Sequence, residues 1–209
     1  MKNWNNKTAI VTGGGSGIGR ALSLALAQRG ARVLVTDINA ASAQSTADGC
    51  GDGATAAALD VRDAAAVTAC VRQFATANGR LDYMFNNAGV GAGGEAHEIP
   101  LAAWQHVIDI NINGVLNGVL AAYPLMVRQG YGHIVNTASL AGLGPAPLLT
   151  PYALSKHAVV GLTTSLRIEA AAYGVGISAL CPSAIETPIL DSKIPATPAF
   201  PGCPTCGGS

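Results

Sequence analysis

The sequence predicts an α/β fold, a doubly wound parallel sheet of about six strands with helices on both faces. Short apolar runs alternate with longer segments of helical periodicity along most of the chain. The runs are apolar at nearly every position, which is typical of parallel strands that are buried on both faces. A glycine-rich turn joins the first run to the first helical segment, as in sheets that bind ligands at the carboxyl ends of their strands.

Local signals then place each element. Strands are expected at 9–11, 32–36, 55–59, 81–85, 133–137 and 176–180. Helices are expected at 17–29, 39–47, 64–78, 104–129 and 151–173. The fourth of these segments is expected to form two helices joined near Asn111. Asp63 and Gly79 are the expected N-cap and stop of the third helix, and Gly30 is the expected stop of the first.

Composition limits the partners that the chain can have. Hydrophobic residues make up 49% of the sequence and charged residues only 11%, which favours self-association. Twelve basic residues balance twelve acidic ones, so no basic excess is available to neutralise nucleic-acid phosphates. No apolar run is expected to reach the length of about 18 residues that a membrane span requires. The five cysteines are an odd number without a framework spacing, so a reduced, cytoplasmic setting is expected.

The glycine-rich turn is the first candidate binding site. It reads T-G-G-G-S-G-I-G from Thr12 to Gly19, directly after a strand and opening a helix. Glycines permit a tight turn and close approach of the backbone to a pyrophosphate, and the helix N-terminus supplies free N–H groups. The alternative is a glycine-rich turn without a ligand. The residues expected to bind a dinucleotide here are Gly13, Ser16, Gly17, Ile18 and Gly19.

Asp37 ends the second strand and is the candidate residue for distinguishing NAD from NADP. A carboxylate at this place can accept hydrogen bonds from the ribose hydroxyls on the adenine side, and it repels a 2′-phosphate. Neither Ser16 nor the positions just after Asp37 carry an Arg or Lys. NAD is therefore favoured over NADP. The alternative is that Asp37 is a helix N-cap or a solvated carboxylate.

Tyr152 and Lys156 form the candidate acid–base pair. They lie four positions apart near the start of a helix, so they share one face. A nearby ammonium is expected to stabilise the phenolate and lower the pKa of the tyrosine, which is about 10 when unperturbed. Such a pair can take a proton from an alcohol or give one to a carbonyl.

From Lys7 to Pro188 the sequence resembles the short-chain dehydrogenase/reductase family, whose fold is of the Rossmann type. The glycine-rich turn is similar to the family's cofactor motif, and N-N-A-G at 86–89 is similar to the motif that supports its sheet. Asn111 lies in D-I-N-I-N-G and matches the catalytic asparagine, while Ser139, thirteen residues before Tyr152, matches the catalytic serine. Asp60-Val61 matches the segment that contacts adenine.

The resemblance implies a role for each catalytic residue. Tyr152 would be the general acid–base, and Lys156 would bind the nicotinamide ribose and tune the tyrosine. Ser139 would hydrogen-bond the substrate oxygen, and Asn111 would hold a water that links Lys156 to solvent. The alternatives are that Ser139 caps a turn and that Asn111 caps a helix, a role for which Asn113 competes.

The resemblance also extends the cofactor site beyond the glycine turn. Thr187 would contact the nicotinamide amide, although it could also be an ordinary loop residue. The family's Pro-Gly after the sixth strand is replaced here by Pro182-Ser183, which makes the path of that loop uncertain. The further residues implied to bind NAD are Asp60, Val61, Asn87, Ala88, Gly89, Tyr152, Lys156, Pro182, Ile185 and Thr187.

The end of the chain departs from the family. Residues 1–188 are expected to form the dinucleotide-binding domain with the catalytic site, and residues 189–209 an irregular tail rich in Pro, Gly and Cys. The lid, the further helix and the seventh strand of the family are not expected in this tail. Cys203 and Cys206 have metal-ligand spacing but no second pair nearby, so no metal site is predicted.

The activity expected is that of an NAD-dependent alcohol dehydrogenase or carbonyl reductase. Two alternatives remain: an NAD-binding protein with little turnover because the substrate-binding elements are missing, and a truncated product of a longer enzyme. A small alcohol or ketone is the expected substrate, and a hydrophobic one is favoured by four leucines expected at the pocket: Leu140, Leu143, Leu148 and Leu149. The two long helices, 111–128 and 151–173, are expected to support a homodimer or homotetramer.

Overall fold

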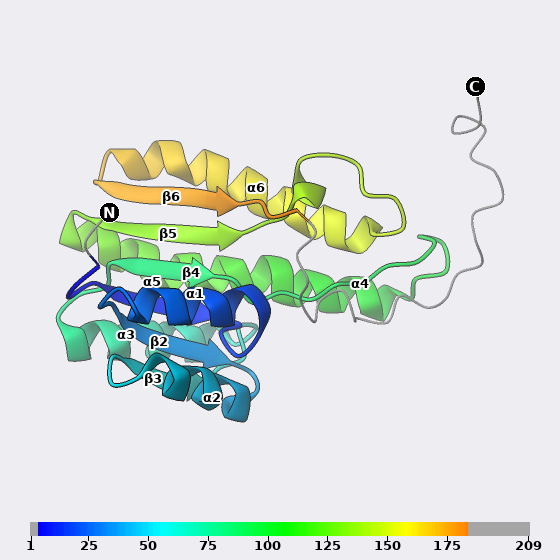
Figure 1. Ribbon diagram of the computed structural model, residues 1–209. Helices are drawn as coiled ribbons and strands as arrows, with labels where there is room; N and C mark the ends of the chain where they lie inside the picture. The colour runs from blue at the N-terminus through cyan, green and yellow to red at the C-terminus, as the bar shows by residue number, and fades with distance from the viewer. Residues whose placement is uncertain (1–3, 184–209) are drawn as a thin grey trace, which may run out of the picture.

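The computed structural model describes residues 4–183, and these residues form one parallel sheet of six strands in the order β3-β2-β1-β4-β5-β6 (Figure 1). The predicted doubly wound α/β fold is confirmed. The strands are β1 (Thr8–Thr12), β2 (Arg32–Asp37), β3 (Ala54–Ala58), β4 (Tyr83–Asn86), β5 (Gly132–Thr137) and β6 (Val175–Leu180). The chain runs outward from β1 to β3 and then returns to β4 beside β1. The carboxyl ends of β1 and β4 therefore meet at the point where the strand order reverses.

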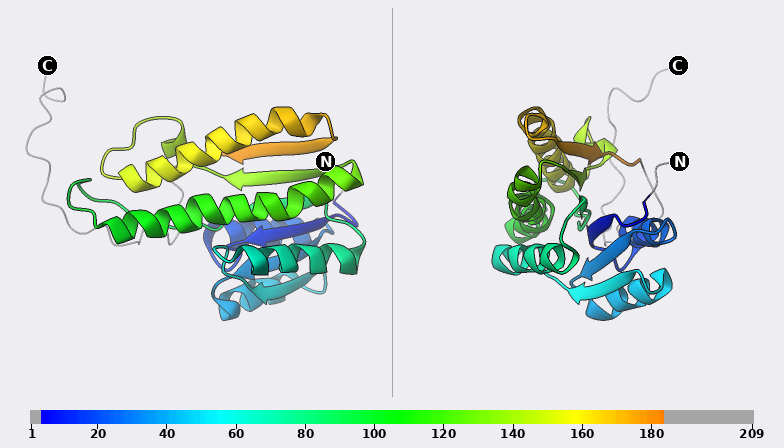
Figure 2. Two further views of the ribbon diagram at one scale, coloured as in Figure 1. Left: turned by 180° about the vertical axis from the view of Figure 1, so that it is seen from behind. Right: turned by 90° about the vertical axis from the view of Figure 1, so that its left-hand side faces the viewer.

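Helices cover both faces of the sheet. They are α1 (Gly17–Ala27), α2 (Ala40–Cys50), α3 (Ala64–Asn78), α4 (Leu101–Ile108), α5 (Gly114–Gln129) and α6 (Thr150–Ala171). Figure 2 shows α3, α5 and α6 on one face and α1 and α2 on the other. Alternate strand residues supply the two cores: Ile10 and Met84 pack toward α3, α5 and α6, whereas Val11 and Val35 pack toward α1 and α2.

The ends of several helices follow from single residues. Asp63 caps α3 because its carboxylate accepts a hydrogen bond from the Ala66 N–H at 2.9 Å, and Gly79 ends the helix at a φ of 70°, as predicted. Asn39 caps α2, which continues to Cys50, so the prediction that this helix ends at residue 47 was wrong. The predicted tail, residues 189–209, lies outside the described residues.

The segment from Leu101 to Gln129 contains two helices, α4 and α5, joined near Asn111 as predicted. The joint is a π-helical turn, Asp109–Asn113, so the helical run is continuous. The run is 29 residues long and apolar enough to cross a membrane by length and composition, so the expectation that no such segment exists was wrong. In the fold α5 packs on β4, β5 and α3, with Val115, Val119 and Met126 buried. Core helices of this kind pass the same test, so the finding does not favour a membrane protein.

Candidate active site

The glycine-rich turn connects β1 to α1 at the carboxyl edge of the sheet. Gly13 has a φ of 61°, and a Cβ on it would lie 2.8 Å from the Cα of Ala88. A Cβ on Gly19 would collide with the Gly13 carbonyl oxygen. Ser16 is the N-cap of α1, and its side chain makes no capping hydrogen bond. The N–H groups of the first turn of α1 can therefore receive an anionic ligand.

Thr12 and Asn87 lock this turn to the segment that follows β4. The Thr12 hydroxyl accepts hydrogen bonds from the Asn87 N–H (2.9 Å) and the Ala88 N–H (3.1 Å). The Asn87 amide donates to the carbonyls of Thr12 (3.1 Å) and Gly13 (3.3 Å). The structure thus brings together Gly13, Asn87 and Ala88, which the sequence predicted from separate motifs. Thr12 was not predicted as a site residue, although its position at the start of the glycine motif could have indicated it.

Asp37 lies against the glycine-rich turn rather than on a helix. One carboxylate oxygen accepts a hydrogen bond from the Gly15 N–H at 3.0 Å, and the other accepts from the Asn39 N–H at 3.0 Å. The N-cap of α2 is Asn39, so the alternative reading of Asp37 as a helix cap was wrong. The two bonds hold a half-buried carboxylate at the end of β2, beside the turn.

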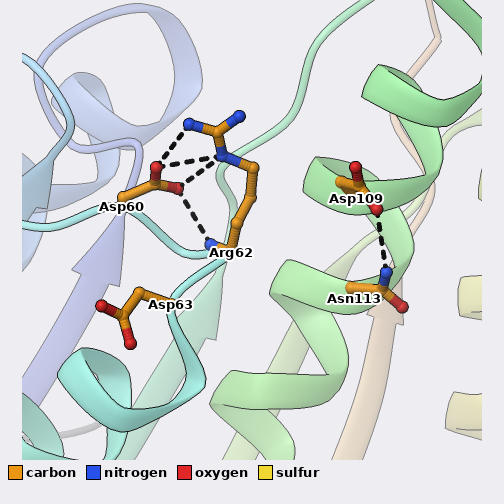
Figure 3. A pocket seen from close by; sticks show the side chains of 5 residues that line it. All are labelled: Asp60, Arg62, Asp63, Asp109 and Asn113. Atoms are coloured by element: carbon orange, nitrogen blue, oxygen red, sulfur yellow. Dashed lines mark hydrogen bonds and ion pairs between the residues drawn. The ribbon is translucent and has the colours of Figure 1, made fainter. Parts of the chain in front are cut away.

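Asp60 forms an ion pair that the sequence analysis did not anticipate. The Arg62 guanidinium donates to both carboxylate oxygens of Asp60, at 2.9 Å and 3.0 Å from Nε, and this contact lowers the pKa of Asp60 (Figure 3). The pair lines a hollow of about 440 Å³ together with Asp63, Asp109 and Asn113. Val61 is buried, and its carbonyl accepts a hydrogen bond from the Asn117 amide at 2.9 Å. The segment after β3 is thereby fixed to α5.

Ser139 and Tyr152 meet at the carboxyl edge of β5. Ser139 opens a short 3₁₀ helix (Leu140–Gly142), and its hydroxyl accepts a hydrogen bond from the Ala141 N–H at 3.2 Å. It therefore caps a turn. Burial raises the pKa of Tyr152, which lies in the first turn of α6, and the nearby Ser139 hydroxyl offsets this only in part.

Lys156 is a buried cation beside this pair. Its side chain is 2% exposed, and Nζ donates to the carbonyl of Thr137 at 2.8 Å. Nζ lies 5.5 Å from the centre of the Tyr152 ring. Burial lowers the pKa of Lys156 to about 8, while Cys181 raises it slightly. The pKa of Tyr152 was expected to be lowered beside Lys156, whereas burial raises it in this arrangement.

Asn111 is fully buried in the π-helical turn. Its Oδ1 accepts from the Val90 N–H at 2.8 Å, and its Nδ2 donates to the Val90 carbonyl at 2.9 Å and to the Ser155 hydroxyl at 3.0 Å. It caps no helix, so that alternative was wrong. A Cβ on Gly89 would lie 3.3 Å from Asn111 Oδ1 and 3.5 Å from Lys156 Nζ. Asn111 and Lys156 thus both face the space beside Gly89 that a side chain there would occupy.

Among the remaining predicted residues, Pro182 belongs to the part of the chain that the structure describes. Pro182 follows β6, and its carbonyl accepts a hydrogen bond from the Leu140 N–H at 2.9 Å. Four residues considered in the sequence lie outside the described residues: Ile185, Thr187, Cys203 and Cys206. Leu140 and Leu143 are 57% and 60% exposed and follow Ser139 directly, so they offer apolar surface beside the Ser139–Tyr152 pair.

Comparison with known proteins agrees with this geometry. The family model described as short chain dehydrogenase matches residues 7–197. A cyclohexanol dehydrogenase from Acinetobacter sp. (strain SE19) is 38% identical over 191 residues, which cover 90% of this chain and 76% of that protein. A 2-dehydro-3-deoxy-L-rhamnonate dehydrogenase (NAD(+)) from Sphingomonas sp. (strain SKA58) is 40% identical over 186 residues, covering 88% of this chain and 74% of that protein.

Solved structures are similar over the same region. A short chain dehydrogenase/reductase from Burkholderia phymatum in complex with NAD superposes with a TM-score of 0.87 at 38% identity, covering 91% of this chain and 70% of that one. Levodione reductase superposes with a TM-score of 0.86 at 34% identity, covering 90% of this chain and 75% of that one. The similarity thus covers most of the chain described above.

Proposed function

The chain belongs to the short-chain dehydrogenase/reductase family, and on that premise we propose that it transfers hydride between NAD(H) and an alcohol or carbonyl substrate. The observation that carries the proposal is the placement of Tyr152 beside the buried Lys156, whose Nζ lies 5.5 Å from the centre of the Tyr152 ring, with Ser139 near enough to lower the pKa of the phenol. These three side chains lie at the same edge of the sheet as the glycine-rich turn. A reacting oxygen placed there would be within reach of a donor pair and of a cation.

The residues of the turn fit a dinucleotide. Gly13 and Gly19 permit the tight packing of the turn, since a Cβ on either would meet protein backbone, and the first turn of α1 offers N–H groups from Gly17 and Ile18 that no side chain caps. Asn87, Ala88 and Gly89 would line the path toward the nicotinamide end, where Tyr152 and Lys156 would hold the ribose. When bound, NAD(H) supplies or accepts the hydride.

The protein's own contribution is proton transfer and charge stabilisation. In the reducing direction Tyr152 gives its proton to the carbonyl oxygen as negative charge develops there, and Ser139 donates a hydrogen bond to the same oxygen. In the oxidising direction the reverse transfer requires the Tyr152 phenolate, formed by loss of the phenol proton to solvent, which takes the hydroxyl proton and becomes the phenol again. A raised pKa keeps Tyr152 as a phenol, and Lys156, with a pKa of about 8, is still protonated at neutral pH. The positive charge of Lys156 would stabilise the Tyr152 phenolate when that phenolate forms.

We propose NAD rather than NADP because of Asp37. Its carboxylate is held by the Gly15 and Asn39 N–H groups, so it cannot easily turn away from a 2′-phosphate. The positions that follow it are Ile38 and Asn39, and Ser16 lies in the turn, so no basic side chain stands there to bind such a phosphate.

The proposed substrate is a small apolar alcohol or ketone. The exposed Leu140 and Leu143 support this class, since they place apolar surface next to Ser139. We also propose a cytoplasmic homodimer or homotetramer. Leu120 on α5 and Leu154 and Ile168 on α6 are 62%, 47% and 80% exposed, which supports self-association through these two helices.

The test begins with calorimetric titration of the full chain with NADH and, separately, with NADPH, followed by turnover of cyclohexanol with NAD. Tight binding of NADH, weak binding of NADPH and measurable turnover would support the proposal. Binding without turnover of a panel of apolar alcohols and ketones would favour an NAD-binding protein with little activity. Failure to bind either cofactor would contradict the proposal.

A further inference from the structure

Ser155 connects two segments that carry the polar groups of the site. It is fully buried on α6, directly before Lys156. Its hydroxyl donates to the Tyr152 carbonyl at 2.7 Å and accepts from Asn111 Nδ2 at 3.0 Å. One side chain therefore joins the first turn of α6 to the π-helical turn between α4 and α5.

The bond from Asn111 also determines how its amide is oriented. Nδ2 has two acceptors, the Ser155 hydroxyl and the Val90 carbonyl, and Oδ1 has one donor, the Val90 N–H. This pattern turns Oδ1 toward Gly89, where a Cβ would lie 3.3 Å from Oδ1 and 3.5 Å from the ammonium nitrogen of Lys156. Removal of the Ser155 hydroxyl would leave the amide held by Val90 alone, and the π-helical turn would lose its polar contact with α6 at this point.

We propose that Ser155 is a positioning residue that fixes the π-helical turn against the first turn of α6 and so sets Asn111, Tyr152 and Lys156 relative to one another. This inference rests on the proposed function for its effect on turnover. A serine within a helix often bonds only to a carbonyl of the preceding turn, which is a local role. Ser155 makes this bond and also accepts from a side chain 44 positions away, which a local role does not require.

The chain contains a matched control for this residue. Thr163 lies about two turns further along α6 and is 2% exposed. Its hydroxyl donates to the Val159 carbonyl at 2.6 Å and accepts from Asn136 Nδ2 at 3.0 Å. The bonding pattern is that of Ser155, but the amide partner sits in β5 and not in the π-helical turn. Both hydroxyls should therefore matter for stability, and only that of Ser155 should matter for the site.

The experiment compares Ser155→Ala with Thr163→Ala in the full chain by two measurements. The first is steady-state oxidation of cyclohexanol with NAD, and the second is hydrogen exchange at the Val90 amide, the donor to Asn111. For Ser155→Ala we expect kcat to fall about tenfold, KM for NAD to stay within about twofold, and Val90 exchange to become about tenfold faster, as expected for one buried hydrogen bond. For Thr163→Ala we expect neither the fall in kcat nor the faster exchange.

Equal effects of the two variants on kcat and on Val90 exchange would overturn the inference, because Ser155 would then be an ordinary buried hydroxyl. A wild-type chain without turnover would contradict the proposed function instead. In that case the exchange rate at Val90 still decides whether Ser155 holds the π-helical turn, since that measurement requires no substrate and no cofactor.

Discussion

Replacing Lys156 with methionine should make the protein more stable and inactive. Lys156 carries its charge in a place that is 2% exposed, and within residues 4–183 its hydrogen-bond acceptor is the Thr137 carbonyl. Methionine is also unbranched and of comparable length, so it can occupy the same space without a charge. The substitution removes the free-energy cost of burying an ammonium. It also removes the cation that is proposed to stabilise the Tyr152 phenolate.

The pKa of Lys156 gives the size of this effect. A pKa of about 8 in the folded chain, against the ordinary 10.5, corresponds to a penalty of about 3 kcal/mol at neutral pH. Loss of the hydrogen bond to the Thr137 carbonyl costs about 1 kcal/mol. Lys156→Met should therefore raise the free energy of unfolding by about 2 kcal/mol at pH 7.

The dependence on pH has a definite sign. Below pH 8 the lysine is protonated in both the folded and the unfolded state, so the wild-type chain carries the full penalty. As pH rises from about 8 to 10.5 the folded state loses this proton first, and the penalty disappears. The wild-type protein should therefore gain stability relative to the variant across this window.

Urea unfolding of both proteins at pH 7 and pH 10 measures the effect, because contributions from all other groups cancel in the difference. We expect the advantage of Lys156→Met at pH 7 to shrink at pH 10, and turnover to be lost at both values. A variant that is no more stable than the wild type at pH 7, or an advantage that does not change with pH, would refute the reasoning.

Three further substitutions test the site. Tyr152→Phe should keep NADH binding in calorimetry and lower kcat by at least about a hundredfold, because the transferred proton is gone; near wild-type turnover would remove Tyr152 from this role. Asp37→Ala should weaken NADH binding and narrow the gap between NADH and NADPH, and an unchanged ratio of the two dissociation constants would show that Asp37 does not read the ribose. Gly19→Ala should abolish NADH binding and lower the melting temperature, since its Cβ meets the Gly13 carbonyl; a variant that binds normally would mean that the turn can shift.

The sequence by itself determined the strands, most helix ends and the edge of the sheet at which the site lies. Apolar runs recur because both faces of the strands are buried, and Asp63 and Gly79 end α3 through bonds and dihedral angles that depend on neighbouring residues only. The order of strands and helices then brings the ends of β1, β4 and β5 together. The sequence alone therefore predicts that the motif residues on those strand ends lie in one site.

Only the tertiary structure decided how these residues act on one another. The apolar pattern of 101–129 is compatible with a break or with a π-helical turn, and in the fold the segment forms the turn, which packs on α6. The hydrogen bond from Asn111 to Ser155 spans 44 positions, and the one from the Gly15 N–H to Asp37 spans 22, so neither has a local signal. The raised pKa of Tyr152 and the lowered pKa of Lys156 follow from burial. Burial is a property of everything packed around a group, and spacing along the chain does not reveal it.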